Sequence, residues 1–125
     1  MNKNELYKLV KKLELPITEY CILSGGSLVM HGIRKDTNDS DIDITKKGFE
    51  IVKKSFSPIL VDENKKQYEI TENIECFLDN NFERDIDFID GYPCQSLMSV
   101  YKFKKRLNRK KDQSDISAIE KVLNI

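Results

Sequence analysis

The chain has 125 residues, 39% of them hydrophobic and 34% charged, and its 21 basic and 21 acidic side chains give a net charge of zero. This length fits one domain, residues 1–125, and is too short for a catalytic domain beside a sizeable substrate-binding domain. The composition excludes a disordered chain, and no apolar stretch approaches the roughly 20 residues of a membrane span. The polar start MNKNELYKLVKK lacks the apolar core of a signal peptide, so we expect a cytoplasmic protein without membrane association.

Hydrophobic periodicity and turn residues predict a series of short helices and strands. In chain order we expect helix 4–13, strand 20–23, helix 27–31, loop 34–38, strand 39–44, helix 49–55, strands 59–61, 67–71, 74–78 and 85–89, and helices 95–107 and 113–123. Gly25 and Gly26 interrupt the first strand, Gly32 ends the second helix, and Gly91 with Pro93 marks a turn. The pattern predicts one α/β (α+β) domain with a mixed central β-sheet flanked by helices.

The cysteines of the chain, Cys21, Cys76 and Cys94, are widely spaced and odd in number. Their spacing matches neither a zinc site nor a disulfide framework. Cys21 and Cys76 lie in apolar, strand-like contexts. We therefore expect buried, inert thiols in a reducing compartment.

Three aspartates alternate with other residues in the expected strand at 39–44. If Asp39, Asp41 and Asp43 lie on one strand, their carboxylates leave the same face. Carboxylates crowded in this way repel one another unless cations neutralise them. Mg²⁺ suits this role because it takes oxygen ligands and shares its remaining positions with water and substrate phosphates. The alternative is a solvated strand edge that charge keeps from aggregating.

A second acidic cluster, Asp85 and Asp87, lies in the apolar run FERDIDFID. Asp87 is flanked by Ile86 and Phe88, which fits a strand with its carboxylate on the polar face. We therefore expect Asp87 as a third metal ligand, with Asp85 and Asp43 as alternates.

The glycine pair and nearby polar residues indicate phosphate binding. Gly25 and Gly26 lack β-carbons and let the backbone approach a phosphate closely, and amides opening a helix at Ser27 direct partial positive charge toward it. Ser27 adds a hydroxyl donor, and Arg34 can bind phosphate with two parallel hydrogen bonds. A triphosphate on metal ions is the ligand that these features favour together.

Two further features have more than one interpretation. His31, the only histidine, is expected to be a packed or helix-capping residue rather than a general base. The segment Lys102 to Lys111 holds seven basic residues and no acidic one. It reads either as the solvated face of a helix, with Tyr101, Phe103 and Leu107 buried, or as a segment that holds a triphosphate or an RNA backbone.

These residues resemble the signature of the nucleotidyltransferase fold superfamily of DNA polymerase beta type, in particular its small bacterial and phage-borne members. That signature is a hydrophobic-Gly-Gly/Ser element, then Asp-x-Asp, then a single acidic residue. Its counterparts here are Gly25-Gly26-Ser27, Thr37-Asn38-Asp39-Ser40-Asp41 and Asp87, with a similar tail at Arg109 to Ile116. Ser40 departs from the usual apolar residue, and Asp43 permits a shifted pair, Asp41 and Asp43; Thr37-Asn38 favours Asp39 and Asp41.

The resemblance implies a minimal nucleotidyltransferase fold and transfer of a nucleoside monophosphate from an NTP to a hydroxyl acceptor, with two Mg²⁺ ions. Asp39 and Asp41 would bind both ions, and Asp87 would bind one and accept the hydroxyl proton. Gly25 to Ser27, Arg34 and Lys111 would hold the triphosphate, while Asp112 or Asp115 would be structural partners. Small members of the superfamily are often parts of toxin–antitoxin or phage-defence systems.

The sequence leaves the acceptor open among a small molecule, an RNA end and a protein side chain. A second copy of the chain or a partner protein could supply a missing wall of the cleft. A rival hypothesis is a non-catalytic module of the same fold that binds a protein or RNA partner. A third is a metal-dependent nuclease, against which the double glycine argues because it suits triphosphate binding better.

Overall fold

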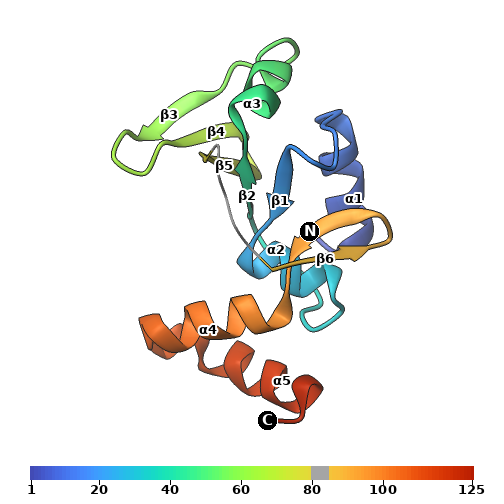
Figure 1. Cartoon of the computed structure of the whole chain (residues 1–125), viewed down its shortest axis with the longest axis vertical. Helices are drawn as coiled ribbons and strands as arrows, with labels where there is room; N and C mark the ends of the chain where they lie inside the picture. The colour runs from blue at the N-terminus through green and yellow to red at the C-terminus, as the bar shows by residue number, and fades with distance from the viewer. Residues whose placement is uncertain (80–84) are drawn as a thin grey trace.

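This computed structural model describes residues 1–79 and 85–125, which form one mixed seven-stranded sheet flanked by five α-helices (Figure 1). The expected fold class is confirmed. The elements are α1 (Lys3–Lys12), β1 (Tyr20–Ile22), α2 (Ser24–Met30), β2 (Ser40–Ile44), α3 (Lys46–Val52), β3 (Ile59–Asp62), β4 (Gln67–Thr71), β5 (Ile74–Leu78), β6 (Ile86–Ile89), β7 (Tyr92–Gln95), α4 (Leu97–Leu107), the 3₁₀ turn η1 (Lys110–Asp112) and α5 (Gln113–Leu123). No helix within the two described ranges is long and apolar enough to cross a membrane.

The sheet places β2 at its centre. The strand order is β3-β4-β5-β2-β1-β7-β6. β2 runs antiparallel to β1 and parallel to β5, and the parallel register sets Asp41 opposite Glu75 and Asp43 opposite Phe77. β6 lies at the edge, with β1 and β7 between it and β2. Residues of β5 are therefore neighbours of the β2 aspartates, whereas residues of β6 are not.

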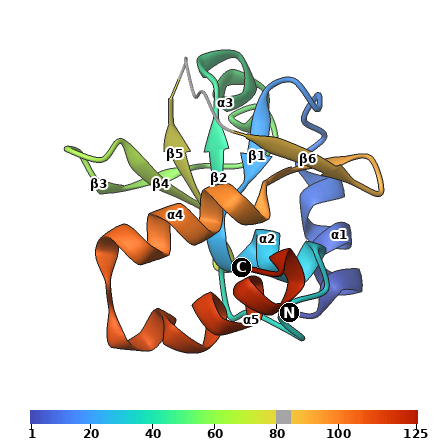
Figure 2. The same cartoon turned by 60° about the horizontal axis from the view of Figure 1, so that its bottom comes forward.

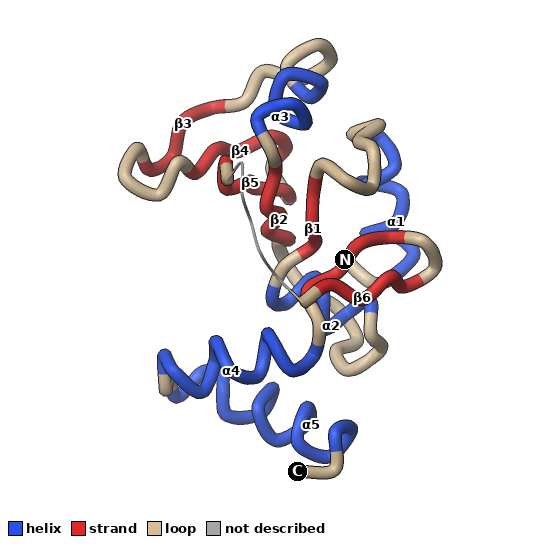
Figure 3. The backbone as a smooth tube through the Cα atoms, viewed as in Figure 1, coloured by secondary structure: helices blue, strands red, loops and turns tan. Residues whose placement is uncertain are grey.

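Two hydrophobic clusters attach the helices to the sheet. The larger one joins Leu6 of α1 and Val52 of α3 to Ile42 and Ile44, which point from β2 to the face opposite its aspartates. The smaller one joins α2 to the last two helices and consists of Leu28, Leu97, Val100 and Ile119. Each fully buried aliphatic side chain stabilises the fold by about 1.5–3 kcal/mol. The α4–α5 pair consequently packs beside α2, far from α3 (Figures 2 and 3).

Local capping explains where most helices begin. Asn2 accepts a hydrogen bond from the Glu5 amide, while its own amide donates to the Glu5 carboxylate, so a capping box opens α1. Thr45 accepts from the Gly48 amide and starts α3 at Lys46, earlier than the expected start at residue 49. The helix expected over 27–31 also begins earlier, at Ser24, but without a side-chain cap, and it includes both glycines in its first turn.

The turn expected at Gly91 and Pro93 extends into an unexpected strand. Asp90 and Gly91 have positive φ angles and reverse the chain, after which β7 pairs antiparallel with β6. Pro93 is compatible with this strand because β7 pairs with β1 through a single registered pair, Ile22 with Cys94. The last long helix before η1 therefore begins at Leu97 instead of residue 95.

Gly26 lies against Ser40 at the junction of α2 and β2. A Cβ at Gly26 would overlap the Ser40 hydroxyl and lie 3.0 Å from Ile22 Cγ2. Ser40 is 1% exposed, and its Oγ is the one buried side-chain oxygen or nitrogen without a hydrogen-bond partner among residues 1–79 and 85–125. The glycine is therefore required by close packing, and the hydroxyl beside it costs stability.

Gly26→Ala is expected to lower the free energy of unfolding by about 1–3 kcal/mol, because the added methyl overpacks this junction. Ser40→Ala should raise it by about 1 kcal/mol, because it removes a buried hydroxyl without a partner. The double variant should recover part of the loss. Urea unfolding of the three variants measures these effects, and a Gly26→Ala protein as stable as the parent would contradict the packing argument.

Candidate functional site

A cleft of about 950 Å³ opens between the β2–β5 part of the sheet and the α4–α5 pair. One wall carries four aspartates: Asp39, Asp41, Asp43 and Asp79. The other parts of the lining carry Arg34 from the loop after α2, Lys65 from the turn between β3 and β4, and Lys104, Arg109 and Lys111 from α4 and the segment after it, with Asp112 and Asp115 beside these last cations. The first turn of α2, Ser24 to Gly26, lies between them. Carboxylates and cations thus face one cavity, which is large enough for a nucleotide.

The three alternating aspartates all reach the cleft. Asp41 and Asp43 lie on β2, and Asp39 immediately precedes it, so the side chains share one face as expected. Asp43 is 2% exposed, whereas Asp39 is exposed. Burial raises the pKa of the Asp41 carboxyl above its ordinary value, and the nearby carboxylates of Glu75 and Asp39 raise it further. The row therefore carries a charge repulsion that a bound cation would relieve.

Sequence reasoning missed Glu75 and Asp79. Glu75 is opposite Asp41 in the parallel β2–β5 register and contributes to its raised pKa. Asp79 follows β5 and lines the cleft, with its amide donating to the Ile44 carbonyl at 2.9 Å. The available signal was an acidic residue inside the strand-like segment IECFL. Whether this residue lies beside the aspartates depends on the pairing of β5 with β2, and the alternation within one strand does not reveal that pairing.

Asp87 lies in a different place from the aspartate row. Adjacent strands are about 4.8 Å apart, and Asp87 is on β6, three strand positions from β2. Its carboxylate is 3.1 Å from His31 Nε2, while His31 Nδ1 is hydrogen-bonded to the Ser27 carbonyl at 2.9 Å. Asp85, the alternate, lines a separate, smaller pocket. The structure does not bring Asp87 or Asp85 to the cleft, and His31 is a packed residue as expected.

The glycine turn is held by Gln95 at the end of β7. The Gln95 side-chain oxygen accepts from the Ser24 amide at 3.0 Å, and its amide nitrogen donates to Ser99 Oγ at 2.9 Å. Ser27, expected to hold phosphate, is fully buried, and its hydroxyl donates to the Gln95 carbonyl at 2.5 Å. Gly25, Gly26 and Ser24, but not Ser27, therefore line the cleft.

Ion pairs fix the basic side of the cleft. Lys104 is buried and donates to Asp112 at 2.8 Å, and Arg109 donates to the same carboxylate at 2.6 Å. Asp115 is 3.4 Å from Lys104 and 3.8 Å from Arg34. Asp112 and Asp115 are thus structural partners, as expected, and Arg34 connects α5 to the loop before β2. Lys111 is exposed at the cleft.

The carboxylates of the cleft are the kind of oxygen ligand that Mg²⁺ prefers. Within residues 1–79 and 85–125, no three acidic, histidine or cysteine side chains are grouped as a preformed metal site. Mg²⁺ does not need one, because it keeps several waters and uses one or two carboxylates together with substrate phosphates. The gathering of Asp39, Asp41, Asp43 and Asp79 at one wall is the observation that favours a cation here. The pKa of Asp41, raised first by burial and then by Glu75 and Asp39, agrees with it.

The fold and cleft define a mixed α/β protein with opposed acidic and basic surfaces around one cavity. Searches of family models, curated proteins and solved structures found no match to this chain. Its function is therefore argued from the cleft itself.

Proposed function

We propose that the protein is a metal-dependent nucleotidyltransferase, which moves a nucleoside monophosphate from an NTP to a hydroxyl acceptor. The observation that carries the proposal is the single cleft in which an aspartate row faces Arg34 and Lys111 across the glycine turn of α2. Metal-complexed triphosphate is the ligand that needs cation-binding carboxylates and phosphate-binding cations at once. The resemblance of Gly25-Gly26 and the aspartates to nucleotidyltransferase motifs agrees with it.

In this proposal Asp41 is the central metal ligand. It belongs to both possible pairs, Asp39 with Asp41 and Asp41 with Asp43, and Glu75 is its neighbour on β5. Asp79, which follows β5 and lines the cleft, replaces Asp87 as the third carboxylate because the sheet order sets β5 beside β2. Glu75 is outside the cleft lining, and its carboxylate accepts a hydrogen bond from the Gln67 side chain. Two Mg²⁺ ions at this row would neutralise the triphosphate and lower the pKa of the acceptor hydroxyl.

The chain's own residues bind and orient the substrates. Arg34 and Lys111 hold phosphate oxygens. Gly25, which has no side chain, lets the Arg34 guanidinium lie against the first turn of α2, since a Cβ there would be 2.9 Å from its Nη1. The acceptor oxygen forms a bond to the α-phosphorus while the bond between the α-phosphorus and the bridging oxygen breaks, and pyrophosphate leaves with that electron pair. The hydroxyl proton passes to the carboxylate row and then to solvent.

The proposed setting is a reducing compartment such as the cytoplasm. Cys21, Cys76 and Cys94 are buried thiols, as expected from the sequence. Burial raises the pKa of the Cys76 and Cys94 thiols to about 12. Thiols that stay protonated at neutral pH are poor nucleophiles, which agrees with a packing role.

Calorimetric titration with a non-hydrolysable ATP or GTP analogue, with and without Mg²⁺, tests the proposal. We expect binding that requires Mg²⁺, and we expect Asp41→Asn to weaken it at least tenfold, because the variant lacks the shared ligand. Asp36→Asn is the matched control, since Asp36 is exposed and outside the cleft lining. If folded protein binds neither nucleotide, the proposal fails in favour of a non-catalytic module. Release of pyrophosphate from NTP on transfer distinguishes the proposed activity from a nuclease.

A further inference from the structure

Asp87 of β6 holds the end of α2, although it lies outside the cleft. Its carboxylate is 3.1 Å from Nε2 of His31, the residue that caps the C-terminus of α2. The Asp87 side chain is 50% exposed, whereas that of His31 is 8% exposed. One surface carboxylate is therefore hydrogen-bonded to a buried ring at the end of a helix whose other end, the glycine turn, lines the cleft.

The His31 ring makes both of its hydrogen bonds only as a cation. Its Nδ1 is 2.9 Å from the Ser27 carbonyl oxygen, and its Nε2 faces the Asp87 carboxylate. Both oxygens only accept hydrogen bonds, so both ring nitrogens must donate, as they do in an imidazolium. The C-terminus of a helix carries a partial negative charge and favours this cation. Asp87 thus stabilises the form of His31 that also bonds to Ser27.

A path of hydrogen bonds leads from His31 to the glycine turn. The Ser27 hydroxyl, 3.3 Å from His31 Nδ1, donates to the Gln95 carbonyl. The Gln95 side chain accepts from the Ser24 amide at the start of the turn. Ser27 is fully buried and Gln95 is 3% exposed. Water therefore does not replace a bond that is lost along this path.

Arg34, the proposed phosphate ligand, lies against α2 at two points. Its amide donates to the Leu28 carbonyl at 3.2 Å, in the turn that follows α2. Its guanidinium lies against the first turn of the helix, where a Cβ at Gly25 would be 2.9 Å from Nη1. Because closely packed elements transmit displacements, a shift of α2 moves the Arg34 side chain within the cleft.

We propose that Asp87 is a positioning residue, which places Arg34 for phosphate binding by fixing α2 through His31. This inference rests on the proposed function and gives Asp87 a role other than metal binding. Without the carboxylate, the His31 ring loses its outer partner, and the bonds to Ser27 and the glycine turn weaken. The aspartate row is unaffected, because no residue of the path belongs to it.

Amide hydrogen exchange of the ligand-free protein tests the path itself. We expect the Ser24 amide to exchange about tenfold faster in Asp87→Asn, the effect of weakening one hydrogen bond. Asp90→Asn is the matched control, because Asp90 pairs with Lys3 of α1 at 3.3 Å and so connects the same hairpin to a different helix. Equal exchange of Ser24 in Asp87→Asn and the parent protein, or equal acceleration in both variants, overturns the path.

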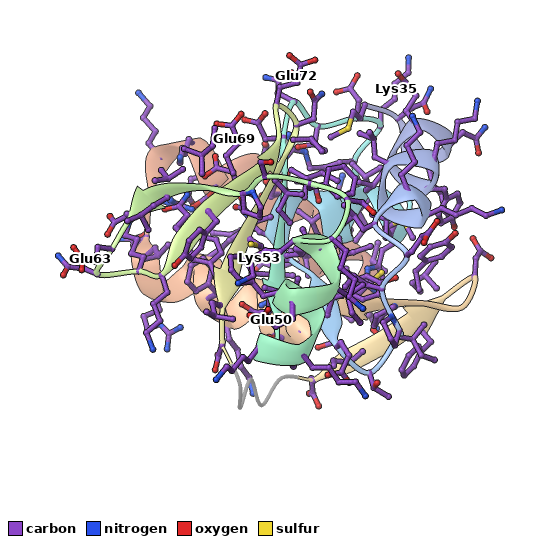
Figure 4. All side chains as sticks on the ribbon, turned by 90° about the horizontal axis from the view of Figure 1, so that it is seen from above. Lys35, Glu50, Lys53, Glu63, Glu69 and Glu72 are labelled. Carbon is purple, nitrogen blue, oxygen red and sulfur yellow. The ribbon has the colours of Figure 1, made fainter. Side chains whose placement is uncertain are left out.

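Titration with the nucleotide analogue and Mg²⁺ tests the effect on phosphate binding. Asp87→Asn should weaken binding about fivefold, the lower end of coupling between separate sites. Asp87→Glu, which keeps the carboxylate, should retain most of the affinity. Glu63→Gln removes the same charge from a side chain that projects beyond β3 into solvent, and it should have no effect (Figure 4). If Asp87 acts through Arg34, adding Asp87→Asn to Arg34→Ala causes no further loss.

The outcomes separate this inference from the proposed function. If the parent protein binds the analogue and Asp87→Asn binds it equally well, the inference fails and the proposed function stands. Additive losses in the Arg34 and Asp87 variants also overturn the inference, because they show that Asp87 acts by another route. If the parent protein binds no nucleotide, both fail. A structural role alone would lower the stability of Asp87→Asn and leave its affinity unchanged.

Discussion

Asp41→Asn is expected to reduce nucleotidyl transfer by about 10³-fold, the scale on which removal of one electrostatic group affects catalysis. The same substitution should stabilise the protein at pH 7 in EDTA. The pKa of Asp41 is raised by burial, Glu75 and Asp39, so its ionisation costs folding free energy as pH rises above its unfolded pKa of about 4. The neutral amide removes this cost. Thermal unfolding between pH 4 and pH 7 measures this cost. As pH rises over this range, the variant should lose less stability than the parent protein.

Stabilisation by Mg²⁺ gives a second test of the role of Asp41. Metal that binds only the folded protein stabilises it, by about 1.4 kcal/mol at ten times the dissociation constant. The parent protein, Asp36→Asn and Asp87→Asn should all show this gain, because neither substituted residue lines the cleft. Asp41→Asn should not. If Asp87→Asn loses the Mg²⁺ response and Asp41→Asn keeps it, the metal site lies at β6, and the assignment to β2 and β5 is wrong.

Asp112→Ala is expected to lower the free energy of unfolding by about 3–5 kcal/mol, because it leaves the Lys104 ammonium buried without its closest carboxylate. Asp115, 3.4 Å away, compensates only in part. The loss should loosen the α4–α5 pair and, with it, the basic side of the cleft. Urea unfolding measures the change.

Two variants test the cause of this loss. Lys110→Ala, an exposed substitution in the same 3₁₀ turn, should change stability by less than about 0.5 kcal/mol. Lys104→Met/Asp112→Leu should recover most of the stability, because it removes both buried charges. The charges that lose a partner are Arg109, which is 40% exposed, and Asp115, which still pairs with Arg34. If the double variant is as unstable as Asp112→Ala, the loss comes from packing and not from the uncompensated charge.

The stability that the ion pairs at Asp112 provide should decrease at acid pH. Burial by itself would raise the pKa of Asp112, but hydrogen bonds and charges from Lys104 and Arg109 outweigh it and hold the pKa below its ordinary value. Its stabilising contribution is therefore complete above the unfolded pKa of about 4 and is lost as pH falls through the lower folded value. The double variant should lack this part of the acid-induced loss.

The sequence by itself determined the local elements and the composition of one wall of the cleft. Apolar spacing and the Asn2 cap specify α1. Alternation places Asp41 and Asp43 on one face of β2, with Asp39 immediately before the strand. These features depend on residues within a few positions of each other, and the periodicity of a helix or a strand is enough to read them.

Only the tertiary structure decided which distant residues join that wall. Asp87 and Glu75 both lie in strand-like segments of the sequence. The order of the strands places Glu75 beside Asp41, and it places Asp87 beside His31. Lys104 resembles the other cations of its segment in sequence, yet it is buried because Asp112 folds back onto it. The physical reason is the same in both cases. Strand order and burial are set by the combined packing of the whole chain, which local periodicity does not encode.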